Sequence, residues 1–253
     1  MYNIVEYLNK IFKSIVLTFL HFIRDILIVI KKHCIPPYAP KTYRRYKTSY
    51  ELYIKEEELK SYEHFKKYFK NAIFLDTKRI RKYAILSALK NDTEQKQLYL
   101  EFGVFNGLSI NYLSKFLKTK MYGFDSFLGL REDWKGTNLE AGHFNKNGET
   151  PKVNSNVELI QGWVQDTLPK FITKDSKINF IHIDLDTYDS TKFVLETVKP
   201  YLNKKTIILF DELYNFSGWD EGEYKALKEV FNENDYEFLA FSIEGCQAVI
   251  QLK

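Results

Sequence analysis

From residue 97 onward, short apolar runs alternate with segments of helical periodicity. The apolar runs lack a polar residue at every second position, which is typical of strands buried on both faces of a parallel sheet. We expect strands at residues 97–103, 121–125, 157–162, 178–184, 206–211, 236–242 and 247–253, and helices at 108–118, 190–202 and 221–234. The sequence therefore predicts an α/β, doubly wound, mostly parallel seven-stranded sheet. The short spacing of the last two strands predicts an antiparallel terminal hairpin.

The N-terminal part, residues 1–35, is strongly apolar with a narrow polar stripe at helical spacing, which predicts an amphipathic helix. Lys13, Arg24 and Asp25 interrupt the apolar stretch, which is thereby shorter than the about 20 residues that cross a bilayer. Such a helix fits either the inner surface of a membrane or packing against protein. Residues 36–95 are expected to form a helical cap or linker, and residues 96–253 the α/β domain.

Charge and cysteine usage bear on partners and compartment. The formal net charge of +4 is small and spread along the chain, so no nucleic-acid partner is indicated. Cys34 and Cys246 are far apart and do not have the spacing of metal ligands, so we expect no disulfide framework. No small-residue cleavage site follows the apolar stretch, which argues against a removable signal peptide. We therefore expect a cytoplasmic protein, with the inner membrane surface as the alternative set by the N-terminal helix.

A glycine-containing turn, EFGVFNG, follows the first strand of the sheet. Gly103 and Gly107 lie where the strand passes into a helix, and glycine there permits backbone dihedrals that are closed to other residues. The spacing differs from the dinucleotide fingerprint and from the phosphate-binding loop. An acid, Glu101, just before the first glycine suits a ligand with an ammonium group, whereas an ordinary tight turn is the alternative.

Two further strand ends carry candidate ligand residues. Asp125 ends the second strand, where an acid is placed to accept hydrogen bonds from ribose hydroxyls. The alternative for Asp125 is a helix cap. Gly162 and Trp163 follow the third strand, near the expected position of an adenine, and Asp166 opens a short helix. The alternative to a ligand-binding role for Trp163 is a structural one.

Carboxylates gather at the ends of two neighbouring strands. HIDLDTYDS ends one strand and FDEL ends the next, which brings Asp184, Asp211 and Glu212 to the same edge of the sheet. Uncompensated, such a cluster repels itself and raises pKa values. Oxygen ligands without cysteine or histidine suit a hard cation such as Mg²⁺. The alternative is helix capping by Asp189 or Ser190, with Asp186 only bracing the loop.

Together these segments resemble the class I S-adenosylmethionine-dependent methyltransferases, and more closely the macrocin/mycinamicin-type sugar O-methyltransferases. The resemblance rests on EFGVFNG, YGFDSFLGL, QGWVQDTLP, HIDLDTYDST and the acidic pair of FDEL, and it covers roughly residues 98–252. It implies a Rossmann-like fold and a Mg²⁺ site at Asp184, Asp211 and Glu212, although Glu212 stands where a second aspartate is usual. The residues that the resemblance and the motifs assign to S-adenosylmethionine are Glu101, Gly103, Val104, Phe105, Asn106, Gly107, Ser109, Asp125, Ser126, Gly162, Trp163 and Asp166.

The implied reaction is Mg²⁺-assisted methyl transfer to a hydroxyl of a sugar or glycan. Asp184 is the main candidate for proton acceptor, with His143 and His182 as others. The long polar segment at residues 132–153 is expected to act as a lid that excludes water. Three alternatives stay open: a metal-dependent methyltransferase of a catechol-like molecule, a D-x-D glycosyltransferase, and a non-catalytic, membrane-attached binding module. A homo-oligomer is also compatible with the sequence.

Overall fold

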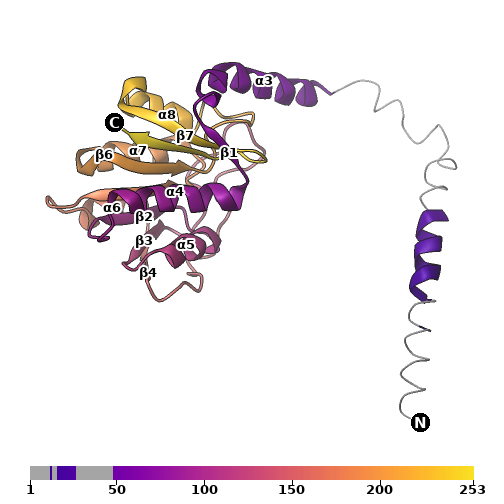
Figure 1. Ribbon diagram of the computed structural model, residues 1–253, viewed down its shortest axis with the longest axis horizontal. Helices are drawn as coiled ribbons and strands as arrows, with labels where there is room; N and C mark the ends of the chain where they lie inside the picture. The colour runs from indigo at the N-terminus through magenta and orange to yellow at the C-terminus, as the bar shows by residue number, and fades with distance from the viewer. Residues whose placement is uncertain (1–11, 13–15, 27–47) are drawn as a thin grey trace, which may run out of the picture. The chain divides into compact units, whose positions relative to one another are not determined.

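The computed structural model describes residues 12, 16–26 and 48–253 (Figure 1). Two compact units divide at Leu52 and Tyr53. In the first unit, residues 16–26 are helical. The rest of the predicted helix at 1–35 and the first part of the predicted linker, residues 36–47, lie outside the described residues. No helix within the described ranges is long and apolar enough to cross a membrane.

Eight strands form one sheet within residues 48–253, in the order β1-β7-β8-β6-β5-β2-β3-β4. β8 runs antiparallel to both of its neighbours, and the other pairs are parallel, which confirms the predicted doubly wound sheet with a reversed end. The strands are β1 (Ile73–Leu75), β2 (Leu98–Phe102), β3 (Met121–Asp125), β4 (Val157–Gln161), β5 (Ile178–Ile183), β6 (Leu202–Phe210), β7 (Tyr236–Ser242) and β8 (Ala248–Leu252).

The predicted count of seven strands was one too low. The additional strand, β1, has three residues and pairs only with β7 at the edge of the sheet. A segment this short, between two helices, has too little apolar periodicity to be recognised as a strand.

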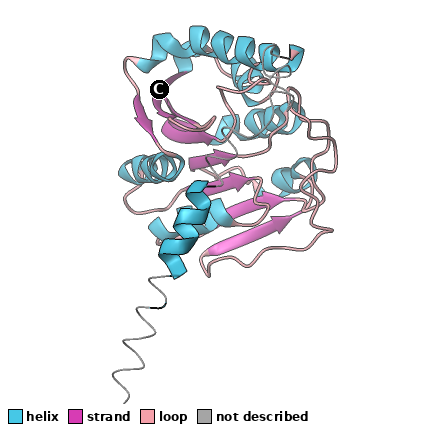
Figure 2. Cartoon of the chain, turned by 90° about the vertical axis from the view of Figure 1, so that its right-hand side faces the viewer, coloured by secondary structure: helices cyan, strands magenta, loops and turns pink. Residues whose placement is uncertain are grey.

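Helices cover both faces of the sheet (Figure 2). One face packs against side chains such as Phe65, Val194 and Leu227 of α3, α7 and α8, and the other against Ile80 and Ile110 of α4 and α5. The helices are α3 (Ser49–Phe69), α4 (Thr77–Asn91), α5 (Leu108–Leu113), α6 (Val164–Phe171), α7 (Tyr188–Val198) and α8 (Glu223–Val230). Because both faces are covered, the carboxyl edge of the sheet is the region where loops enclose a ligand site.

The helix predicted at 190–202 has different limits. α7 begins at Tyr188 and ends at Val198, and Lys199–Tyr201 form a 3₁₀ turn before β6. Pro200 lacks the N–H that would continue the α-helix. The N-cap of α7 is Thr187, and no side chain caps this helix by a hydrogen bond, so the proposed capping by Asp189 or Ser190 was wrong.

Candidate functional site

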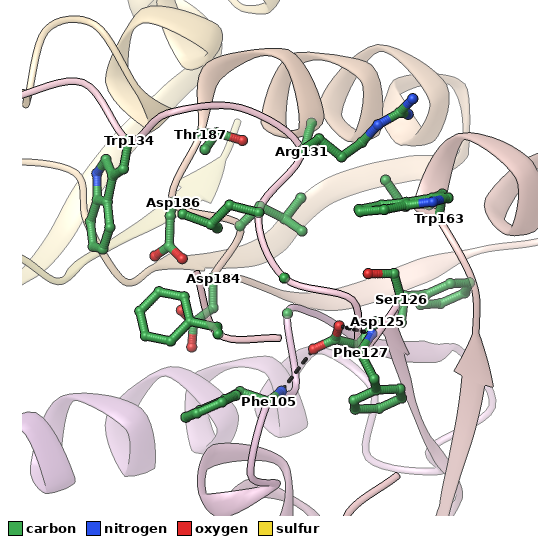
Figure 3. Close-up of a pocket in the computed structure, with 18 of the residues that line it drawn as sticks. Phe105, Asp125, Ser126, Phe127, Arg131, Trp134, Trp163, Asp184, Asp186 and Thr187 are labelled. Atoms are coloured by element: carbon green, nitrogen blue, oxygen red, sulfur yellow. Dashed lines mark hydrogen bonds between the residues drawn. The ribbon is translucent and has the colours of Figure 1, made fainter. Parts of the chain in front are cut away.

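A cavity of about 230 Å³ lies among the loops that follow β2, β3, β4, β5 and β6 (Figure 3). These loops all leave the carboxyl edge of the sheet, where the sequence predicts a ligand site. Six of the residues predicted to bind S-adenosylmethionine line the cavity: Gly103, Phe105, Asp125, Ser126, Gly162 and Trp163. Asp184 and Glu212 line it as well, whereas Asp211 does not.

The turn after β2 is fixed by a close approach of two backbones. Gly103 has a φ of +88°, and a Cβ at this residue would lie 1.7 Å from the carbonyl oxygen of Asp184. Only glycine fits, because any side chain would overlap the backbone at the end of β5. The glycine that we expected to admit a ligand therefore also brings the β2 and β5 loops together.

The carboxylate of Asp125 braces this turn. Its Oδ2 accepts hydrogen bonds from the backbone N–H groups of Val104 and Phe105, both at 2.8 Å. Its Oδ1 accepts a third from Phe127 N at 2.7 Å. Asp125 does not cap a helix, so that alternative was wrong. The ribose role stays a prediction for a residue that lines the cavity and also holds two loops together.

One end of the cavity is aromatic. Figure 3 shows Trp163 and Arg131 together at this end, with Ser126 and Phe127 nearby. The guanidinium carbon of Arg131 lies 5.1 Å from the centre of the Trp163 ring, in the range of a cation–π contact. A flat, mostly apolar surface of this kind suits an aromatic base.

The opposite end is acidic. Carboxylate oxygens of Asp184, Asp186 and Glu212 all lie within 4.8 Å of one another. Burial, followed by repulsion from Asp211, raises the pKa of Asp184 and of Glu212 well above its ordinary value. The same causes raise the pKa of Asp186 to about 7. These carboxyl groups therefore need either protons or a cation to compensate their charge.

The donor set fits a divalent cation. All three side chains offer hard oxygen ligands, and Glu212 Oε2 is a buried atom without a hydrogen-bond partner among the described residues. Asp186, for which the sequence predicts bracing of the loop as an alternative, thus belongs to the acidic end. Its φ of +62° is uncommon for a non-glycine residue and turns the chain sharply after β5.

Asp211 is held differently from the other acids. Its Oδ1 accepts hydrogen bonds from Arg81 at 2.9 Å, His182 Nε2 at 3.2 Å and the amide of Gln247. Although burial opposes ionisation, the bonds from His182 and Arg81 hold the pKa of Asp211 well below its ordinary value. Asp211 groups with Asp184 and His182 rather than with Glu212, so the predicted set of three ligands is not brought together as one cluster.

Both candidate histidines lie off the cavity wall. His182 is fully buried, and its Nδ1 lies 3.0 Å from Glu101 Oε2 while its Nε2 faces Asp211. Burial alone would lower the pKa of His182, but the hydrogen bonds to Asp211 and Glu101 raise it to about 10. His143 is exposed in the loop after β3, where its ring contacts Phe144. The geometry therefore gives neither histidine access to a ligand in the cavity.

Glu101 also faces inward rather than toward the cavity. Its carboxylate accepts a hydrogen bond from Ser109 Oγ at 2.8 Å and pairs with His182, and its side chain is fully buried. Among the predicted cofactor residues, those that do not line the cavity are Glu101, Val104, Asn106, Gly107, Ser109 and Asp166. The lining residues that sequence reasoning missed include Phe124, Arg131, Trp134, Phe144, Leu185, Asp186 and Thr187.

The segment at 132–153 contains no helix or strand and is fixed by backbone hydrogen bonds. Leu130 N donates to His143 O, and Lys146 N donates to Phe127 O. Trp134 lines the cavity, and its buried indole N–H has no partner among the described residues. This placement was not recognised in the sequence because Trp134 belongs to a segment without periodicity.

Comparison with known proteins gives one family match and several similar folds. A family profile described as a methyltransferase domain matches residues 100–213. No curated protein sequence matches the chain. The structure of CalS11, a calicheamicin methyltransferase, is similar with a TM-score of 0.55 and 20% identity over 81% of this chain and 94% of that chain. The structure of the O-methyltransferase NovP has a TM-score of 0.52 and 15% identity over 70% of this chain and 79% of that chain.

At these identities the structural similarity concerns the fold. Residues 100–213 thus match a methyltransferase domain, and the sheet has the fold of these methyltransferase structures. The profile match supports the predicted methyltransferase enzyme.

Proposed function

We propose that this protein transfers a methyl group from S-adenosylmethionine to a hydroxyl of a sugar or glycan, with the assistance of a divalent cation. The observation that carries the proposal is that one cavity has Trp163 with Arg131 at one end and a group of carboxylates at the other. A second CalS11 structure, of a TDP-rhamnose 3′-O-methyltransferase, supports a sugar acceptor by analogy of fold. It is 23% identical over 69% of this chain and 77% of that chain, with a TM-score of 0.50.

The aromatic end is assigned to the methyl donor. S-adenosylmethionine supplies a methyl group on a positively charged sulfur. Trp163 would stack on the adenine, with Arg131 closing over the indole, and Ser126 and Asp125 would face the ribose. The turn at Gly103 would hold the methionine part beside Asp184. Glu101 is left out of the direct contacts because its carboxylate is buried against Ser109 and His182.

The acidic end is assigned to the cation and the acceptor. Asp184, Asp186 and Glu212 would hold the ion, with Asp211 fixed beside Asp184. A divalent cation bound there supplies a positive charge that lowers the pKa of a substrate hydroxyl. The acceptor oxygen bonds to the methyl carbon while the carbon–sulfur bond breaks, and the hydroxyl proton passes to a carboxylate. Asp184 is the proposed proton acceptor, since both histidines lie off the cavity wall.

The loop at 132–153 is proposed to exclude water from the reacting atoms. Trp134 places an apolar ring in the cavity from this loop. The side chain of Ser217 donates a hydrogen bond to the carbonyl of Gly136, which ties the loop to the segment after β6. A dry site favours the transition state because opposite charges cancel as the hydroxyl oxygen attacks the sulfonium.

Transfer of a labelled methyl group from S-adenosylmethionine tests the function. The purified full chain is incubated with Mg²⁺ and either TDP-rhamnose or catechol as acceptor. The proposal predicts labelled sugar and no labelled catechol, with loss of transfer in Asp184→Asn. Methylation of catechol alone would support the small-phenol alternative and contradict the sugar assignment. A D-x-D glycosyltransferase is disfavoured by the methyltransferase match, and a non-catalytic module would transfer no label.

We also propose that the protein is cytoplasmic and contacts the inner membrane surface through the N-terminal segment. Within the described residues, the apolar side chains of this segment are exposed: Phe12, Val16, Leu17, Phe19, Leu20, Phe22, Ile23 and Ile26. Sedimentation with anionic lipid vesicles should fall several-fold in Leu20→Glu and stay unchanged in the adjacent His21→Glu. Equal sedimentation of both variants would contradict membrane contact, and a loss of self-association in Leu20→Glu would instead indicate a homo-oligomer.

A further inference from the structure

Glu223 is a fully buried carboxylate that does not line the cavity. It is the first residue of α8, and the next residues, Tyr224, Ala226 and Leu227, anchor this helix in the core. Glutamate is rarely buried in this way unless its charge is compensated or its oxygens are used. The position of Glu223 therefore needs an explanation beyond packing.

The two oxygens of Glu223 have different surroundings. Oε2 accepts a hydrogen bond from the backbone N–H of Glu212 at 3.1 Å. Oε1 has no hydrogen-bond partner among the described residues. Burial, with added repulsion from Asp186 and Asp211, raises the pKa of Glu223 well above its ordinary value. Glu223 thus lies next to the acidic end of the cavity without lining the cavity itself.

The bond to Glu212 lies in a segment without regular secondary structure. β6 ends at Phe210, and residues 211–222 contain neither helix nor strand. Glu212 must nevertheless present its carboxylate to the group formed with Asp184 and Asp186. A rigid acceptor on α8 fixes the peptide of Glu212 and so limits the directions that its side chain can take.

We propose that Glu223 is a positioning residue of the cation site, which holds the Glu212 peptide so that the Glu212 carboxylate points to the ion. The inference rests on the cation part of the proposed function. Glu223 does not belong to either group of side chains whose ligand atoms lie within 4.8 Å, so it acts through Glu212 and not as a ligand. Groups that orient metal ligands typically change metal affinity by about 10–100-fold when they are removed.

Binding of Mn²⁺ to the full chain, followed by the loss of the free-ion electron paramagnetic resonance signal, tests this role. Glu223→Gln keeps the length and one carbonyl oxygen that accepts from Glu212 N–H, whereas Glu223→Asp keeps the carboxyl group but loses reach. Positioning predicts that Mn²⁺ affinity falls about tenfold or more in Glu223→Asp and Glu223→Ala and less than about threefold in Glu223→Gln. Affinity for S-adenosylmethionine should stay within about twofold in all variants.

The control is Glu221→Ala, which removes an exposed glutamate two residues away that pairs only with Lys225 among the described residues. It should bind Mn²⁺ as the wild type does. A larger loss in Glu223→Gln than in Glu223→Asp would show that charge matters and not position, and would overturn the inference. Wild-type affinity in folded Glu223→Asp would overturn it as well. If the wild type itself binds no Mn²⁺, the cation part of the proposed function fails, and the role of Glu223 fails with it.

Discussion

The carbonyl oxygen of Asp184 occupies the space that a side chain at residue 103 would fill. The turn after β2 and the end of β5 are thereby in direct backbone contact, and each contributes to the cavity. Substitution at Gly103 should consequently disturb the aromatic end and the acidic end of the cavity together.

Gly103→Ala tests this contact. The Cβ would lie 1.7 Å from Asp184 O, so one of the two loops must shift. We expect the free energy of unfolding to fall by about 1–3 kcal/mol more than in Gly142→Ala. Gly142 is the matched control, because its φ of +85° imposes similar backbone strain while nothing lies within 4 Å of a Cβ there. Equal losses in urea unfolding would show that strain alone matters.

Asp125→Ala is expected to lower the free energy of unfolding as well as the affinity for S-adenosylmethionine. The substitution leaves the backbone N–H groups of Val104, Phe105 and Phe127 without their acceptor. An unsatisfied buried donor costs about 1–3 kcal/mol. Urea unfolding in the absence of ligand should therefore show a loss of this size. Unchanged stability with weakened binding would mean that Asp125 contributes to the ligand alone.

Arg81 should stabilise the acidic end in the absence of a cation. Its guanidinium donates to Asp211 Oδ1, and both side chains are mostly buried. Arg81→Met leaves the carboxylates less compensated, so we expect a loss of about 2–4 kcal/mol in unfolding free energy. Arg79→Met on the same helix removes the ion pair between Arg79 and Asp76, in which the arginine is largely exposed. This substitution should lower the free energy of unfolding by less than about 1 kcal/mol. Similar losses in the two variants would contradict a special role for the Arg81 pair.

Trp163→Ala tests where the adenine of the methyl donor binds. The chain has three tryptophans, so another tryptophan can serve as the control. Stacking of a base on an aromatic ring contributes about 1–3 kcal/mol, so Trp163→Ala should weaken S-adenosylmethionine binding by about 5–150-fold. Trp219→Phe is the control, because Trp219 packs against Phe65 and Tyr224 away from the cavity. Donor affinity that is unchanged in Trp163→Ala would place the adenine elsewhere.

Much of the fold could be predicted because its signals are local. The runs that became β2 to β8 are continuous in sequence, and the acids and glycines of the site follow strand ends directly. β1 was missed because three residues carry no pattern, and the end of α7 was set by Pro200 inside an otherwise helical stretch.

The less predictable parts of the site depend on contacts between distant residues. Arg81 and Asp211 are 130 positions apart, so nothing near Asp211 in the sequence shows that a guanidinium occupies its Oδ1. His182 is a candidate proton acceptor from its place beside Asp184 in the sequence, yet strand alternation turns it toward Glu101 in the core. Asp186 has a positive φ, which cannot be predicted from its residue type, and this conformation places it at the cavity.

Calorimetric titration of the full chain with S-adenosylmethionine, with and without Mg²⁺, tests the central claim most directly. The account predicts saturable binding to one site per chain, retained in Trp219→Phe and strongly weakened in Trp163→Ala. Binding should also raise the unfolding free energy by about 2.7 kcal/mol when the ligand is present at 100 times its Kd. No binding under either condition, from a protein that unfolds cooperatively, would contradict the assignment of this cavity to the methyl donor.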